Sequence, residues 1–310
     1  METNRPQPVI LDGGLATQLE AQGHDIDNPL WSAALLVSNP GAIVDAHLAY
    51  LSAGAEIVTS ASYQASRAGL NQLGFAAAEA DRLIASSVRL ARDAADRHRA
   101  DGGHAGRVAA SVGPYGAVLH DGSEYTGDYG VPAGILHRFH VPRLEVLDGA
   151  GADLLAVETI PSALEASVLA ELLAQCRTPA WVSFCCRDGA SLSDGSPVAD
   201  AAARFAQHPT VFGVGVNCTA PQHVLPLIEK LRHAAPDKAV VVYPNSGETW
   251  SADGNRWSGE TQRSGFADAA ASWFDAGATH IGGCCRVGPA NIAELRARWP
   301  LSAGASAVQS

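Results

Sequence analysis

The stretch 152-ADLLAVET-159 decides the fold, because it shows the unit from which the whole chain is built. It is a short apolar run that ends in polar residues, and Gly151 stands just before it, where a preceding helix can end. Seven other segments repeat this design at intervals of roughly 25 to 50 residues. They are PVILDGG (8–14), AEIVTSASY (55–63), RVAASVGPYG (107–116), PAWVSFCC (179–186), VFGVGVNC (211–218), KAVVVYPN (238–245) and ATHIGGCC (278–285). Such bounded apolar runs are typical of strands that are buried on both faces.

The segments between these runs have the pattern of helices that cover a sheet. The stretch AIVDAHLAYLSAG (42–54) is amphipathic, with Asn39 as a start signal and Gly54 as a stop signal. Eight alternations of strand and helix predict an α/β fold, a closed (β/α)8 TIM barrel with a single domain at residues 1–301. Residues 302–310 are expected to form a flexible tail. A doubly wound open sheet is the alternative, which the lack of a GxGxxG turn after the first strand disfavours.

Composition and charge exclude several classes of protein. The net charge of -11 and the lack of a Lys or Arg cluster argue against binding to nucleic acid. The sequence has no apolar run of about 18 residues and no secretion signal, so we expect a cytoplasmic protein with no membrane partner. The 6 cysteines all lie in the second half of the chain, unlike the framework of a small disulfide-rich protein. They are expected to be reduced thiols or metal ligands.

Three cysteines are predicted to lie at strand ends on the same face of the barrel. Cys218 ends the sixth apolar segment, and Cys284 and Cys285 end the eighth. Only one strand separates the two ends, which puts them about 10 Å apart at the backbone. Three thiolates there could hold one zinc ion and leave a fourth position open. Gly282 and Gly283 are expected to relax the backbone so that both neighbouring side chains turn toward one metal.

The spacing leaves other interpretations of the thiols open. Buried packing is the first, since free Cys is among the most buried residue types. A second adjacent pair, Cys185 and Cys186, could supply one of the three ligands. His223 is a further candidate ligand, although we expect it on the helix that follows Cys218. A disulfide between neighbouring cysteines is disfavoured because their Cα atoms lie only about 3.8 Å apart.

Other polar residues near the strand ends are candidate contacts for a substrate. They are Asp12, Gly13, Ser60, Tyr63, Glu158 and Asn217, joined by Trp31 from a loop. A buried carboxylate costs several kcal/mol unless it meets a cation or hydrogen-bond donors. Glu158 could therefore bind the ammonium group of a ligand, or it could cap the helix that follows. The same two interpretations apply to Asp12.

Two long connections follow the third and seventh strands, at residues 114–133 and 246–262. Barrel enzymes build their sites from such loops on the carboxyl face of the sheet. Aromatic residues in the loops either shield the top of the barrel or face a cationic ligand through cation–π contacts. Tyr125 and Tyr129 lie in the first of these loops and Trp250 and Trp257 in the second, and the same two interpretations apply to Trp31 and Tyr63 elsewhere in the chain.

With these motifs the chain resembles the homocysteine S-methyltransferase family from residue 10 to about residue 290. The resemblance rests on LDGGLATQLE (11–20), VTSASYQAS (58–66), VGPYGAVLHDGSEYTGDY (112–129), VETIPS (157–162), VNCTAP (216–221), YPNSGETW (243–250) and IGGCCRVGP (281–289). The combination of the single Cys of VNC with the later GGCC is specific. SASYQA, DGSEYTGDY and YPNSGE are more similar to the branch that uses S-methylmethionine or S-adenosylmethionine than to the betaine-dependent branch.

The resemblance implies a (β/α)8 barrel with a zinc ion bound by Cys218, Cys284 and Cys285. Cys185 and Cys186 match no ligand position of the family, which favours core packing for them.

The resemblance also implies that Glu158 binds the amino group of homocysteine and that the Asp12–Gly13 turn is part of the amino-acid pocket. Thr159 stands where the betaine-dependent branch has Tyr, so the sequence does not indicate the fourth ligand of the resting metal.

The expected activity is zinc-dependent transfer of a methyl group to homocysteine, which gives methionine. A thiol with a pKa of about 8.5 is mostly protonated at neutral pH, and coordination to zinc removes that proton. The expected donor is S-methylmethionine, with S-adenosylmethionine as a second donor, because a sulfonium loses its charge as the methyl leaves. A betaine or other onium donor and a non-catalytic barrel with a structural zinc are the alternatives. A zinc hydrolase is disfavoured because three thiolates make zinc a poor Lewis acid. The sequence does not indicate the oligomeric state.

Overall fold

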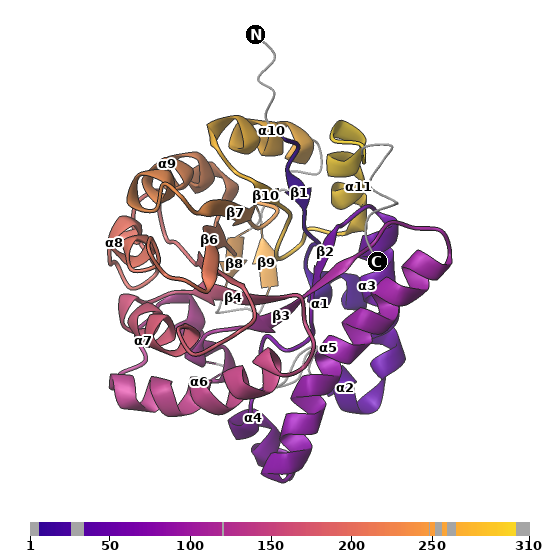
Figure 1. Ribbon diagram of the computed structural model, residues 1–310, viewed down its shortest axis with the longest axis vertical. Helices are drawn as coiled ribbons and strands as arrows, with labels where there is room; N and C mark the ends of the chain where they lie inside the picture. Colours follow the sequence, from indigo (N-terminus) through magenta and orange to yellow (C-terminus); the bar gives the residue numbers. More distant parts are fainter. Residues whose placement is uncertain are drawn as a thin grey trace.

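Eight parallel strands form one sheet that curls into a barrel with helices around it (Figure 1). In the computed structural model, the order of the strands is β1-β10-β7-β6-β5-β4-β3-β2. The strands are β1 (Val9–Ile10), β2 (Ile57–Thr59), β3 (Arg107–Val112), β4 (Leu154–Ile160), β5 (Ala180–Phe184), β6 (Val211–Asn217), β7 (Ala239–Tyr243) and β10 (His280–Ile281), and a separate hairpin contains β8 (Thr249–Ser251) and β9 (Arg256–Ser258). The structure describes residues 6–25, 34–119, 121–247, 249–251, 256–258 and 265–301. Each predicted segment contains one strand of the large sheet, so the predicted barrel is confirmed.

The barrel closes between its first two strands through a few backbone contacts. Leu11 and Ile57 form an isolated parallel bridge. The Asp12 N–H donates to the Ile57 carbonyl at 3.0 Å, and the Glu56 N–H donates to the Ile10 carbonyl at 2.7 Å. Because β1 also pairs with β10, closure places Asp12 between the end of β2 and the end of β10.

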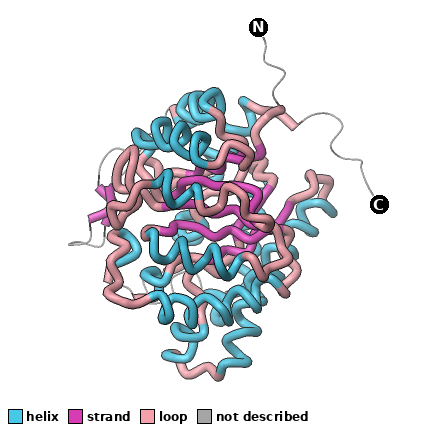
Figure 2. Tube along the Cα trace, turned by 60° about the vertical axis from the view of Figure 1, so that its left-hand side comes forward, coloured by secondary structure: helices cyan, strands magenta, loops and turns pink. Residues whose placement is uncertain are grey.

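Helices surround the strands, as Figure 2 shows for the cyan helices outside the magenta sheet. They are α1 (Leu15–Ala21), α2 (Leu35–Ser38), α3 (Pro40–Ser52), α4 (Arg67–Gln72), α5 (Ala77–Ala100), α6 (Ala133–Asp148), α7 (Ala163–Leu173), α8 (Val198–Ala203), α9 (Val224–Ala234), α10 (Phe266–Ala276) and α11 (Pro289–Arg298), with short 3-10 helices η2 (Tyr115–Val118), η3 (Ser123–Tyr125) and η4 (Pro221–His223). The predicted start of α3 is confirmed, since Asn39 Oδ1 accepts from the Ala42 N–H at 3.4 Å. Gly54, the predicted stop, follows the helix with a φ of 104°.

Two hydrophobic clusters hold the barrel together. The larger cluster joins residues of the helices to outward-facing residues of the strands. The smaller cluster contains only residues of the strands and their immediate ends, so it fills the inside of the barrel: Leu11, Ile57, Ala109, Leu154, Ala156, Trp181, Val241 and Tyr243. The barrel interior is therefore a packed core and not a pore, which leaves the strand ends and the loops above them for a site.

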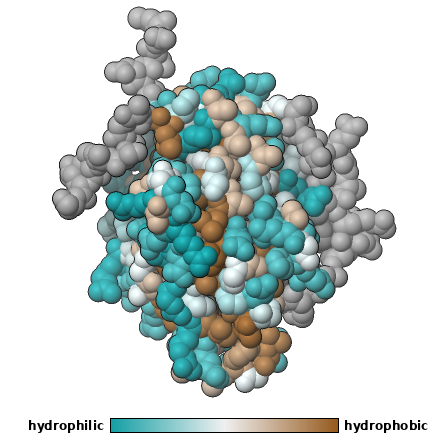
Figure 3. All heavy atoms as spheres, turned by 90° about the vertical axis from the view of Figure 1, so that its right-hand side faces the viewer, coloured by the Kyte–Doolittle hydropathy of each residue, from teal (hydrophilic) through white to brown (hydrophobic). Residues whose placement is uncertain are grey.

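The surface of the molecule and the ends of the chain indicate less about the position of a functional site. The face drawn in Figure 3 is mostly hydrophilic, with apolar residues at its lower end and in a narrow strip through its middle. Within the described residues, none of the helices has both the length and the apolar character needed to cross a bilayer. The cytoplasmic location and the domain bounds stay predictions, and the predicted tail at residues 302–310 lies outside the described residues.

One buried histidine of α3 makes the stability of the fold depend on pH. His47 is fully buried, and neither of its ring nitrogens has a hydrogen-bond partner within the described part of the chain. Burial lowers its pKa from 6.5 to about 4, so the folded protein keeps the ring neutral while the unfolded chain takes up a proton. A group of this kind reduces the free energy of unfolding as the pH falls from about 6.5 to about 4.

We expect His47→Leu to remove this dependence. Between pH 7 and pH 5, the loss in the free energy of unfolding should be smaller than in the wild type by about 2 kcal/mol, as measured by urea denaturation. His137→Leu, at an exposed position on α6, is the control and should keep the wild-type slope. An unchanged slope in His47→Leu would show that the ring does not titrate as described.

Candidate metal centre and active site

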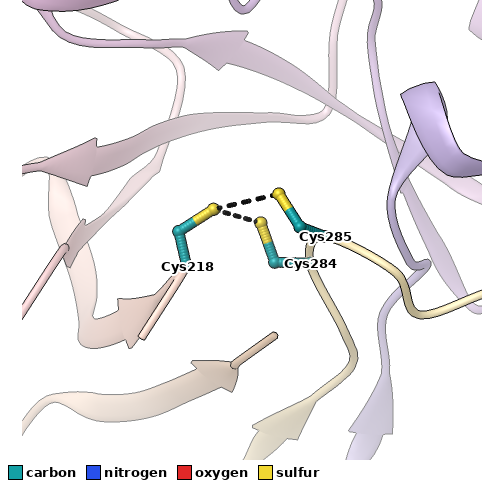
Figure 4. A group of neighbouring side chains, drawn as sticks. All are labelled: Cys218, Cys284 and Cys285. Atoms are coloured by element: carbon teal, nitrogen blue, oxygen red, sulfur yellow. Dashed lines mark hydrogen bonds between the residues drawn. The ribbon is translucent and has the colours of Figure 1, made fainter. Parts of the chain in front are cut away.

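Three thiols from two strand ends meet at the carboxyl rim of the barrel (Figure 4). Cys218 follows β6, and Cys284 and Cys285 follow β10, with β7 between the two strands. The Sγ atom of Cys218 lies 2.6 Å from that of Cys284 and 3.7 Å from that of Cys285. Among the residues that the structure describes, these three form the one group of possible metal ligands whose donor atoms all lie within 4.8 Å of one another.

The three thiols share protons through hydrogen bonds. The pKa of Cys218 is raised well above its ordinary value by its hydrogen bonds with Cys284 and Cys285 and by burial, which favours the protonated form. The pKa of Cys285 is lowered by its hydrogen bonds with Cys218 and Cys284. A divalent cation that replaces the shared protons leaves all three sulfurs as thiolates, so the cluster can bind a metal.

The other candidate ligands lie outside this cluster. Cys186 belongs to the hydrophobic core, and Cys185 is buried with its thiol 3.5 Å from the carbonyl oxygen of Cys218. Both contacts agree with packing as the role of this pair. His223 ends η4 and is not part of the metal-ligand group.

Gly282 and Gly283 act differently from the sequence expectation. Neither has a positive φ, so they do not give the chain an unusual backbone conformation. A Cβ on Gly282 would lie 2.6 Å from the carbonyl oxygen of Asp12, and one on Gly283 would lie 2.1 Å from Cγ1 of Val287. The two glycines are needed because the chain before the cysteines passes very close to the end of β1 and to the segment before α11.

Two buried carboxylates lie beside the thiols, near the ends of β1 and β4. Asp12 Oδ2 accepts from the backbone N–H of Thr59 at 2.7 Å and from its hydroxyl at 3.1 Å. Glu158 accepts a short hydrogen bond from the Ser111 hydroxyl. Burial raises the pKa of Asp12, to which the charge of Glu158 adds, and burial raises the pKa of Glu158 to about 7. These carboxylates therefore need a cation to stay charged at low cost.

The capping interpretation of both carboxylates is wrong. The N-cap of α7 is Ser162, whose hydroxyl accepts from the Glu165 N–H at 3.2 Å. The N-cap of α1 is Gly14, and no side chain caps that helix. Asp12 and Glu158 therefore keep the alternative interpretation, in which each faces a ligand cation.

Asn217 connects two strand ends whose backbone is in an unfavourable conformation. Its Oδ1 accepts from the Thr159 N–H at 2.7 Å, and its amide nitrogen donates to the Thr159 hydroxyl at 2.7 Å. Thr159 and Cys218 have φ values of 62° and 47°, a region that costs a residue with a side chain about 1 to 3 kcal/mol. The same amide nitrogen lies 3.9 Å from Cys284 Sγ. Asn217 thus holds the end of β4 and two metal-ligand candidates in one arrangement, and its predicted contact with substrate stays a prediction.

Three of the remaining predicted residues lie at the same rim. Ser60 is buried and its hydroxyl accepts from the Ser111 N–H at 3.2 Å, so it supports the partner of Glu158. The pKa of Tyr63 is raised by burial and by the charge of Cys218, which places its phenol near the thiols.

Gly13 is required by space, because a Cβ there would lie 2.2 Å from the Val287 carbonyl oxygen. Trp31 lies outside the described residues.

The sequence did not point to three residues that support the site. Ser111 bonds to Glu158 from β3, and Tyr243 at the end of β7 also lowers the pKa of Glu158 through a hydrogen bond. Arg143 on α6 is 1% exposed and donates to the carbonyl oxygens of Gly113 and Ser62 at 2.9 and 2.6 Å. A polar residue inside an apolar strand could have indicated Ser111, whereas the pattern of α6 has no signal for a buried arginine.

Comparisons with known proteins agree with this geometry. The family described as homocysteine S-methyltransferase matches residues 9–299. A protein named homocysteine S-methyltransferase from Escherichia coli is 47% identical over 294 residues, covering 94% of each chain. Homocysteine S-methyltransferase 4 of Zea mays is 46% identical over 298 residues, covering 92% of this chain and 87% of the relative.

The similarity extends to a solved structure. The crystal structure of the homocysteine methyltransferase MmuM from Escherichia coli, described as the metallated form, has a TM-score of 0.85 and 45% identity. The match covers 95% of this chain and 97% of that one. The form of the same protein described as apo has a TM-score of 0.76.

The metal cluster predicts which cysteines are needed to bind a metal. We expect Cys218→Ser and Cys285→Ser to lose the bound metal, because a serine hydroxyl is a much weaker ligand for a soft cation than a thiolate. Cys185→Ser is the matched control, buried in the same region, and should retain it. Metal content measured by mass spectrometry of the purified proteins tests this, and metal loss only in Cys185→Ser would refute the ligand assignment.

The hydrogen bonds of Asn217 predict that replacing its side chain weakens metal binding, although Asn217 is not itself a candidate ligand. We expect Asn217→Ala to weaken metal binding by about 10- to 100-fold. Without the hydrogen bonds of this side chain, the cysteines that bind the metal are no longer held in position. Competition with a chelator measures this affinity. Thr210→Ala, near the opposite end of β6, is the control. Equal metal affinity in Asn217→Ala and the wild type would show that the side chain does not position the thiols.

Proposed function

Because the chain belongs to the homocysteine S-methyltransferase family, we propose that it transfers a methyl group from a sulfonium donor to the sulfur of homocysteine and so forms methionine. S-methylmethionine is the proposed donor, with S-adenosylmethionine as a second one. One observation carries the proposal. Three thiols from β6 and β10 converge at the barrel rim beside two buried carboxylates, which is a place for a metal and an amino acid together.

Zinc is the proposed metal, held by Cys218, Cys284 and Cys285. Two sulfurs on one tetrahedral zinc lie about 3.8 Å apart, given zinc–sulfur bonds of about 2.3 Å. The 3.7 Å between the Cys218 and Cys285 sulfurs fits this value, whereas the sulfurs of Cys218 and Cys284, 2.6 Å apart, would move apart by about 1 Å to bind the ion. When bound, zinc keeps the homocysteine sulfur deprotonated at neutral pH. Within the described residues the cluster supplies three ligands and not four, which supports an open position for substrate rather than a purely structural site.

The two buried carboxylates are proposed to hold the amino group of homocysteine. Asp12 and Glu158 carry negative charge into a region shielded from water, and the charge of each raises the cost of the other. An ammonium group placed between them offsets both charges and supplies three hydrogen-bond donors. The amino acid is thereby oriented with its sulfur toward the three thiols.

The methyl transfer is a single displacement. A lone pair of the homocysteine sulfur forms the new bond to the methyl carbon, while the bond between that carbon and the donor sulfur breaks. The electron pair of the broken bond stays on the donor sulfur, which becomes a neutral thioether. No oxidant, reductant or proton is consumed in this step. The residues contribute by holding the two sulfur atoms and the carbon in line.

The proposal is tested by supplying three donors in parallel. The metal-loaded protein is incubated with homocysteine and S-methylmethionine, S-adenosylmethionine or betaine, and methionine is measured by chromatography. We expect methionine with the two sulfonium donors and none with betaine. Turnover with betaine alone would assign the other onium class, and no turnover with any donor by a protein that holds its metal would contradict the proposal.

The raised pKa of Glu158 predicts that homocysteine binding depends on pH. Its pKa of about 7 means that the carboxylate is charged above pH 7 and becomes neutral as the pH falls below it. We expect KM for homocysteine to rise as the pH falls through 7 in the wild type. Glu158→Gln should raise this KM at pH 8 by about 10- to 100-fold, since a hydrogen bond to a charged group contributes about 1.5 to 3 kcal/mol, and should flatten the dependence between pH 6 and pH 8.

Steady-state kinetics at several pH values measure this effect. Glu171→Gln, at an exposed position on α7, is the control and should follow the wild type. An unchanged KM for homocysteine in Glu158→Gln would remove Glu158 from the amino-acid pocket.

A further inference from the structure

Glu124 is a buried carboxylate outside the proposed binding sites for the metal and for homocysteine. It lies in η3, in the long loop after β3, and is only 9% exposed. Its Oε2 atom is buried without a hydrogen-bond partner in the described part of the chain, and the same is true of the neighbouring Ser123 hydroxyl. An unpaired buried carboxylate costs several kcal/mol. Such a cost is expected where a ligand completes the contacts.

Two tyrosines, Tyr63 and Tyr125, lie near both Glu124 and the thiols. The pKa of Tyr63 is raised by burial, then by the charges of Cys218 and Glu124. The pKa of Tyr125, the next residue of the loop, is raised by burial and then by the charges of Cys285, Cys218 and Glu124. Both phenols therefore lie close enough to the carboxylate and to the thiols to feel the charge of each.

The loop that carries Glu124 is anchored on both sides of η3. Glu165, which is fully buried on α7, accepts from the Tyr115 N–H at 2.6 Å and from the Tyr129 hydroxyl at 2.8 Å. The His140 ring lies 2.8 Å from the same carboxylate. The two tyrosines precede and follow η3, so the loop is fixed on both sides of Glu124.

The loop is also tightly packed beneath Glu124. A Cβ on Gly116 would lie 2.6 Å from the backbone nitrogen of Glu124. The backbone that carries Glu124 is therefore closely packed, and a fixed backbone reduces the entropy lost when a ligand binds.

A cation with aromatic contacts is the ligand that these groups fit. No Lys or Arg side chain of the described residues forms an ion pair with Glu124, and Glu124 is not part of the metal-ligand group. A sulfonium has no N–H or O–H group, so charge attraction and contact with the faces of aromatic rings are what can bind it. Glu124, Tyr63 and Tyr125 offer both.

We propose that Glu124, with the rings of Tyr63 and Tyr125, binds the positive charge of the methyl donor beside the metal cluster. This assignment rests on the proposed function. The homocysteine side of the site then ends at Asp12 and Glu158, and the donor side is the loop after β3.

The loss of the sulfonium charge during the reaction predicts that a substitution of Glu124 affects KM and kcat differently. The sulfonium charge disappears as the methyl leaves, so the carboxylate binds the donor more strongly than it binds the transition state. Glu124→Gln should therefore raise KM for the sulfonium donor by about 10- to 100-fold while kcat stays the same or rises. KM for homocysteine and the metal content should not change. A residue that only supports the fold would lower kcat and disturb both substrates.

A pair of inhibitors tests the role of charge directly. One is a sulfonium analogue of the donor that cannot transfer its methyl group, and the other is its uncharged isostere with carbon in place of the sulfonium sulfur. We expect Glu124→Gln to weaken binding of the charged inhibitor and to leave binding of the neutral one unchanged. Asp128→Asn, at an exposed position in the same loop, is the matched control and should bind both inhibitors like the wild type.

Three results would overturn the assignment. These are an unchanged donor KM in Glu124→Gln, an equal weakening of both inhibitors, and equal donor KM values in Glu124→Asp and Glu124→Gln, since Glu124→Asp keeps the charge and should be intermediate. Glu124→Asp also decides the question if Glu124→Gln does not fold, because its donor KM should then lie above the wild-type value with kcat preserved. A wild-type protein that is inactive with every sulfonium donor refutes the proposed function instead, so the two failures are distinguishable.

Discussion

Buried negative charge at the carboxyl ends of parallel strands is the constraint on which the site depends. Asp12 follows β1 by two residues, β4 carries Glu158 near its end, and β6 and β10 lead into the three cysteines. Barrel closure through Leu11 and Ile57 brings the first of these ends next to the last.

Each of these anions is costly where it lies unless a cation accompanies it. The proposed chemistry supplies three cations: a metal ion for the thiolates, the ammonium of homocysteine for the carboxylates of β1 and β4, and a sulfonium for the carboxylate of the loop after β3. Substrate binding and charge compensation are then the same event, and a donor whose charge disappears on reaction is released easily.

The fold keeps this arrangement through backbone contacts that lie behind the site. Asn217 holds Thr159 through two hydrogen bonds and stands next to Cys218. Both Thr159 and Cys218 have a positive φ despite having side chains, as does Arg286 beside Cys285. From the outer layer, Arg143 of α6 reaches the strand ends, and Glu165 of α7 holds the loop after β3. These two helices therefore support the loops above the strand ends.

The barrel and the proximity of the three cysteines were predictable because buried parallel strands have a recognisable sequence pattern. Strands buried on both faces appear as apolar runs, and the residue that ends each run lies on the carboxyl rim. Partners across strands leave no such pattern, since the Ser111 hydroxyl and Glu158 are 47 residues apart and joined only by the register of β3 and β4. Gly282 and Gly283 were misread as flexible points because the close approach to β1 appears only in three dimensions. The pattern of residues 114–133 indicated a long loop with aromatic residues, but not that Glu124 is buried there with an unpaired oxygen.

The central claim is that the substrate sulfur joins the three thiols on one metal ion. X-ray absorption at the metal edge, recorded for the metal-loaded protein before and after addition of homocysteine, measures this directly. The account predicts that the number of sulfur ligands rises from three to four. A spectrum with an unchanged number of sulfur ligands, under conditions in which homocysteine is turned over, would contradict it.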